Sequence, residues 1–112
     1  MALEGDYIVD EAQLAKLSFN PSTGAKVGPF TNSGWYQLVS TKNCFVKVVS
    51  KDAAVAGADA DADADAASVT GDNGCDLFSG NGEKWYIPEG GYLGAIGYPG
   101  MSGEIRIHRV GK

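Results

Sequence analysis

Side chains able to support chemistry are few in this sequence: two cysteines, Cys44 and Cys75, one histidine, His108, and a run of aspartates. A Cys–His pair could provide nucleophilic catalysis, but no local motif places either cysteine beside His108. The three residues also lack the spacing of a zinc site. No glycine-rich stretch has the phosphate-binding spacing followed by a helix. We therefore expect no enzymatic activity, no cofactor and no bound metal.

The aspartates alternate with alanine between residues 59 and 65, and D-x-D-x-D is how an EF-hand calcium loop begins. The rest of that motif is missing. For a loop that starts at Asp59, Ala64 stands where glycine is needed and Thr70 stands where the bidentate glutamate is needed. Four close negative charges also oppose a compact fold. The pattern favours a solvated acidic surface loop over residues 52–74, with a calcium site as the alternative.

The net charge of −5 comes from one segment of the chain. Residues 52–76 hold seven aspartates and no base, which gives −7, and the other residues hold seven acids and nine bases, which gives +2. Because the body has no dense basic patch, nucleic acid is not an expected partner. No apolar run approaches the roughly 20 residues of a membrane span, so a membrane is not expected either. No signal-peptide pattern is visible, and synthesis in the cytosol is expected.

The two cysteines allow two interpretations. Free cysteines commonly pack as small apolar side chains, which favours two partly buried thiols. Alternatively, Cys44 and Cys75 face each other, because each begins a predicted strand on either side of the acidic segment. A disulfide there would close that segment at its base, and it would have to form after release from a reducing cytosol.

Short runs rich in Val, Tyr, Phe, Trp and Ile predict strands at intervals of about ten residues from residue 35 onward. The predicted strands are 35–40, 44–50, 75–78, 84–88, 92–98 and 104–110. The first two are expected to pair as a hairpin across residues 41–43, with Asn43 in a left-handed conformation. In the last, Ile105 and Ile107 are expected to point inward, opposite to Arg106. This spacing predicts an all-β fold: a small antiparallel β-sandwich or jelly-roll-like barrel over residues 34–112.

The first 33 residues carry a weaker pattern, which we interpret as an N-terminal arm with patches of structure. Residues 7–9 form a candidate strand, Asp10 could cap a two-turn helix over residues 11–17, and residues 18–33 are rich in turn-forming residues. The alternative is that this segment provides a first strand and loop of the sandwich itself.

The order WYQLVSTKNCFVKVVS, acidic loop, short strand and EKWYIPEGGYLGAIGYPGMSGEIRIHRV resembles the small β-sandwich virion proteins of tailed bacteriophages over residues 35–110. This resemblance implies a non-enzymatic capsid decoration or cement protein on the capsid surface of the virion, or else a collar, head-fibre or tail component. Its partners would be the major capsid protein or other virion proteins, with the chain itself as a homo-oligomer. We expect apolar residues of the arm to bind the partner: Tyr7, Ile8, Val9, Leu14, Leu17 and Phe19.

Aromatic side chains support a second hypothesis, a carbohydrate- or receptor-binding module. Trp35, Trp85, Tyr92 and Tyr98 could act as stacking platforms if they are exposed. Packing of these rings in the core is the favoured expectation. A third hypothesis is an adhesive domain stabilised by calcium at the acidic loop.

Overall fold

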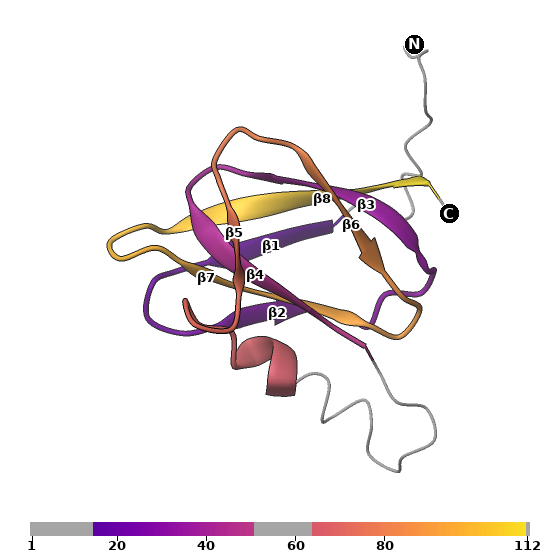
Figure 1. Ribbon diagram of the computed structural model, residues 1–112, viewed down its shortest axis with the longest axis horizontal. Coiled ribbons are helices and arrows are strands. Elements are labelled where there is room, and N and C mark those ends of the chain that lie inside the picture. Colours follow the sequence, from indigo (N-terminus) through magenta and orange to yellow (C-terminus); the bar gives the residue numbers. More distant parts are fainter. Residues whose placement is uncertain (1–14, 51–63, 112) are drawn as a thin grey trace.

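Two four-stranded antiparallel sheets make up the computed structural model, which describes residues 15–50 and 64–111 (Figure 1). The strands are β1 (Ala15–Phe19), β2 (Ala25–Val27), β3 (Gly34–Ser40), β4 (Cys44–Val49), β5 (Cys75–Leu77), β6 (Glu83–Ile87), β7 (Tyr92–Gly97) and β8 (Gly103–Gly111). Sheet A has the order β1-β8-β3-β6, and sheet B has the order β2-β7-β4-β5. No described helix is long and apolar enough to cross a membrane.

The strand order is that of a jelly roll. Consecutive strands β1 and β2, β3 and β4, β5 and β6, and β7 and β8 are divided between the two sheets, so each of these connections crosses the edge of the sandwich. The first and last strands pair side by side in sheet A. Eight strands in two sheets with these crossings define the double-sheet jelly roll. The predicted all-β sandwich is confirmed.

Alternation of apolar and polar residues decides which side of each strand faces the core. In β8, Ile105 and Ile107 are fully buried whereas Arg106 is exposed, as the period of two predicted. The same holds in β6, where Ile87 is buried and Tyr86 is exposed. The inward side chains of both sheets, together with Phe30 from the connection between β2 and β3, form one cluster: Leu17, Phe19, Phe30, Tyr36, Leu38, Cys44, Val46, Leu77, Ile87, Leu93, Ala95, Ile105 and Ile107.

The predicted hairpin between β3 and β4 is wrong. β3 pairs with β6 and β8, β4 pairs with β5 and β7, and residues 41–43 carry the chain from one sheet to the other. Asn43 does not have a positive φ; instead its side-chain oxygen accepts a hydrogen bond of 2.9 Å from the amide of Ser79. The crossing places the apolar sides of β3 and β4 against each other, which buries both, whereas a hairpin would set them side by side.

The predicted boundary of the N-terminal arm is also wrong. Residues 15–17 are extended in β1 rather than helical, because β1 pairs with β8 over its whole length. β2 then pairs with β7, so residues 15–33 contribute to both sheets, as the alternative interpretation held. The predicted strand at 7–9 and the remainder of the predicted helix lie outside the described residues.

The acidic segment folds back onto sheet B in its second half, which corrects the prediction of a solvated loop through residue 74. A single helical turn at residues 64–67 buries Ala66, and Val69 after it is also buried. Lys47 on β4 holds the turn through an ion pair of 2.7 Å with Asp65. The first half of the predicted loop lies outside the described residues, together with Asp59, Asp61 and Asp63.

Candidate binding surface

The outward side of sheet A presents exposed aromatic and basic side chains. Trp35 on β3 lies directly opposite Tyr86 on β6, and their ring centroids are 5.6 Å apart with an angle of 72° between the planes. Trp35 is 45% exposed and Tyr86 is 47% exposed. Large aromatic side chains that remain half exposed on a folded domain are typical of residues that become buried in an interface.

Basic residues dominate the rest of this side. Lys16 on β1 lies opposite Arg106 on β8, while Lys84 on β6 lies opposite Gln37, whose other neighbour is His108. The single acid among the described outward residues of sheet A is Glu104. The surface therefore combines an aromatic pair on β3 and β6 with excess positive charge, which suits a partner surface that carries carboxylates.

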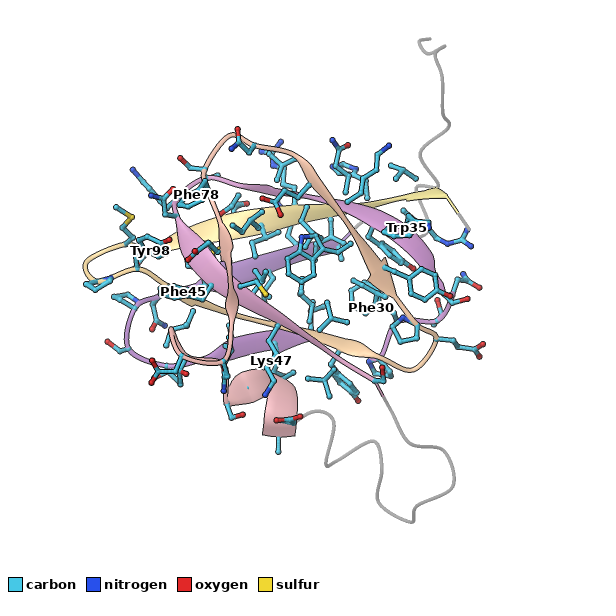
Figure 2. The ribbon with its side chains drawn as sticks, viewed as in Figure 1. Phe30, Trp35, Phe45, Lys47, Phe78 and Tyr98 are labelled. Carbon is cyan, nitrogen blue, oxygen red and sulfur yellow. The ribbon has the colours of Figure 1, made fainter. Side chains whose placement is uncertain are left out.

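A second aromatic group lies at the end of the molecule away from Trp35, where Figure 2 shows Phe45, Phe78 and Tyr98 together. Phe45 and Tyr98 are stacked with centroids 4.6 Å apart, and Phe78 meets Tyr98 edge-on at 6.4 Å. The hydroxyl of Tyr98 donates a 2.7 Å hydrogen bond to Asp76, and this bond raises the pKa of Tyr98. These three rings pack mainly against one another, although Phe78 is 45% exposed.

The residues predicted to bind a partner divide into two groups. Leu17 and Phe19 are 5% and 4% exposed and belong to the core, so neither is free to contact another protein while the sandwich is folded. Tyr7, Ile8, Val9 and Leu14 lie outside the described residues. The hypothesis of partner binding through the segment before β1 therefore rests on these four alone.

Of the four rings proposed as stacking platforms, Trp35 is the one that is exposed on the surface. Its ring contact among the described residues is with Tyr86, which is exposed as well. Trp85 packs against the core, and its indole NH donates to Glu83 at 3.2 Å. Tyr92 is buried, and Tyr98 is stacked on Phe45.

Sequence analysis did not identify Tyr86 as a member of this surface. Its outward direction was predictable from alternation in β6, but its position beside Trp35 depends on the register of two strands about 50 residues apart.

Neither cysteine forms a disulfide. Cys44 is buried on the inward side of β4 and Cys75 is exposed on β5, and the register sets Cys75 opposite Val46 rather than opposite Cys44. Burial raises the pKa of the Cys44 thiol, and a contact with the Ser40 hydroxyl at 3.7 Å opposes that shift.

Cys44 and His108 do not form a catalytic pair. Cys44 points inward from sheet B, whereas His108 points outward from sheet A. Within residues 15–50 and 64–111, no cluster of three or more His, Cys, Asp or Glu side chains could hold a metal ion.

Comparison of the chain with protein-family models, curated proteins and solved structures finds no match. The fold and the surface themselves define the class: over the described residues, a jelly roll of eight strands with one sheet that presents an exposed aromatic and basic outer side.

Proposed function

We propose that this chain is a non-enzymatic structural protein of a tailed-phage virion that binds the outer surface of the capsid and stabilises it. The motifs that carry the resemblance fall on strands β3 to β8. The jelly roll is also a fold found among viral capsid proteins, which supports the proposal by analogy, although lectins share it.

The observation that carries the proposal is the pair of half-exposed rings, Trp35 and Tyr86, on a basic sheet surface. Burial of two such rings against a partner removes apolar surface from water at the centre of a contact, where binding energy concentrates. The surrounding bases then favour a partner rich in carboxylates. Sheet A would face the capsid, while residues 64–69 of the acidic segment, which fold back onto sheet B, would face away from it.

Binding to undecorated capsid shells tests the proposal. A chain with Trp35→Ala and Tyr86→Ala should bind at least about 30-fold more weakly, since even one interface hot spot contributes about 2 kcal/mol or more. Phe78→Ala is the matched control, because Phe78 is equally exposed but follows β5, at the end of the molecule away from Trp35. Full binding by the double variant, or equal loss in the control, would reject sheet A as the capsid-binding side.

Binding through the segment before β1 requires a separate test, and the start of β1 at Ala15 decides which residues can be deleted without disrupting the fold. Deletion of residues 1–20 would remove β1 and with it Leu17 and Phe19 from the core. Deletion of residues 1–14 keeps the eight strands of the described residues and removes Tyr7, Ile8, Val9 and Leu14. If these residues bind the capsid or a neighbouring copy, this shorter deletion weakens binding without lowering the melting temperature. Unchanged binding would exclude them from the mechanism.

Carbohydrate binding is the second candidate, and the exposure of Trp35 favours it. However, the 72° angle between Trp35 and Tyr86 makes a corner rather than one continuous flat platform for a sugar ring. Protein docking is therefore the better-supported function. Saturable glycan binding by the isolated domain, lost with Trp35→Ala, would reverse this preference.

A further inference from the structure

A hollow lies on the outward side of sheet A where β1 meets β8, away from the β3–β6 pair that holds the exposed rings. The described residues that line it are Ala15, Lys16, Arg106 and His108. Lys16 and Arg106 are direct cross-strand partners, so their Cβ atoms are about 5 Å apart. His108 follows Arg106 by two residues and points to the same side of the sheet.

The described residues provide neither an ion pair for the two bases of this hollow nor a hydrogen bond for its buried ring nitrogen. Among the described residues, the side chains of Lys16 and Arg106 form no ion pair, although like charges directly opposite each other in a sheet are destabilising. Glu104 lies on the same side but opposite Ser18, and it pairs with neither base. His108 adds a buried ring nitrogen, Nδ1, that has no hydrogen-bond partner. A buried polar atom without a partner calls for an explanation, and a bound water or anion is one that the neighbouring bases favour.

We propose that this hollow is an oxyanion-binding subsite that takes a carboxylate or phosphate group. Arg106 offers the planar pair of NH donors that matches two oxygens, Lys16 supplies a second positive charge, and His108 donates from Nδ1 in the tautomer that carries a proton there. An anion held among these three groups removes the repulsion between the bases and gives the buried nitrogen a partner. The inference rests on the geometry of β1 and β8 alone and does not depend on the proposed function.

The single histidine of the chain provides the readout, because its imidazole NMR signals belong to His108 without further assignment. Phosphate or acetate is titrated into the full-length protein while chloride is withdrawn to keep the ionic strength constant. Both anions, or phosphate alone, should shift the His108 signals saturably. Lys16→Gln and Arg106→Gln should each weaken binding by about tenfold, as expected for loss of one charge-assisted hydrogen bond.

Lys42→Gln is the matched control: it removes one positive charge at the exposed turn between β3 and β4, outside the lining of the hollow, and should leave the titration unchanged. A well-dispersed amide spectrum of each variant establishes that the fold is intact. The proposal is overturned if neither anion gives a saturable shift, or if the shift persists at full affinity in both the Lys16 and the Arg106 variants. A phosphate response stronger than the acetate response would identify a dianion as the preferred group, and equal responses would identify a site that also accepts protein carboxylates.

Discussion

The backbone of Ala66 lies directly over Gly94 in β7, so close that a Cβ atom added to Gly94 would overlap the Ala66 carbonyl oxygen. This contact, together with the Lys47–Asp65 ion pair, attaches the second half of the acidic segment to sheet B. Val49 and Tyr92 pack beside Ala66 in a small cluster on the outward side of that sheet. The chain that leaves sheet B at the end of β4 therefore returns to cover part of the same sheet.

Gly94→Ala should destabilise the protein by about 1–3 kcal/mol, because the added methyl meets backbone rather than the flexible end of a side chain. Urea unfolding measures the change. The same substitution should cost much less in a variant whose residues 52–68 are replaced by a short Gly-Ser linker, since the overlapping carbonyl is then gone. An equal cost in both backgrounds would mean that the helical turn does not rest on Gly94.

Tyr36→Phe should lower the free energy of unfolding by about 1 kcal/mol. Tyr36 is fully buried, its hydroxyl donates a 2.6 Å hydrogen bond to the carbonyl of Asn32, and its ring meets Phe30 edge-on at 5.0 Å. Tyr36→Leu, which also loses the ring contact, should cost more. Urea midpoints at constant slope measure both, and a Phe variant as stable as the parent would show that the hydroxyl contributes nothing.

Alkaline pH should destabilise the protein through Cys44. Burial raises the pKa of this thiol above its ordinary value of 9.0 in the folded state, so the unfolded chain loses the proton first. The contribution is present below that ordinary value and is lost as pH rises from there through the raised folded pKa. Unfolding measured between about pH 7.5 and 10 should show a steeper decline for the parent than for Cys44→Ala. Cys75→Ala, which removes the exposed thiol, should keep the parental decline.

The two tryptophans should differ in solvent access. Trp35 is 45% exposed, whereas Trp85 packs partly against the core. Acrylamide should therefore quench the fluorescence of Trp85→Phe, in which only Trp35 emits, more strongly than that of Trp35→Phe. Bound capsid shells should protect Trp35 if sheet A is the binding side. Equal quenching of the free single-tryptophan proteins would contradict the exposures described for β3 and β6.

The sequence by itself determined the positions of six strands and, for β6 and β8, which side chains face inward. Ile105 and Ile107 alternate with Arg106, and Trp85 and Ile87 alternate with Tyr86, because neighbouring side chains on a strand point to opposite sides whatever the strand pairs with. Such alternation is local, and it survives any choice of partner strand.

Only the tertiary structure decided which strands pair. The chain between β3 and β4 crosses between sheets, Leu17 and Phe19 enter the core, and Trp35 lies beside Tyr86. Each of these depends on contacts between residues far apart in the chain, whose free energy comes from burying two whole sheets together rather than from any short pattern. For the same reason the hollow between β1 and β8 could not be predicted from the separate positions of Lys16, Arg106 and His108.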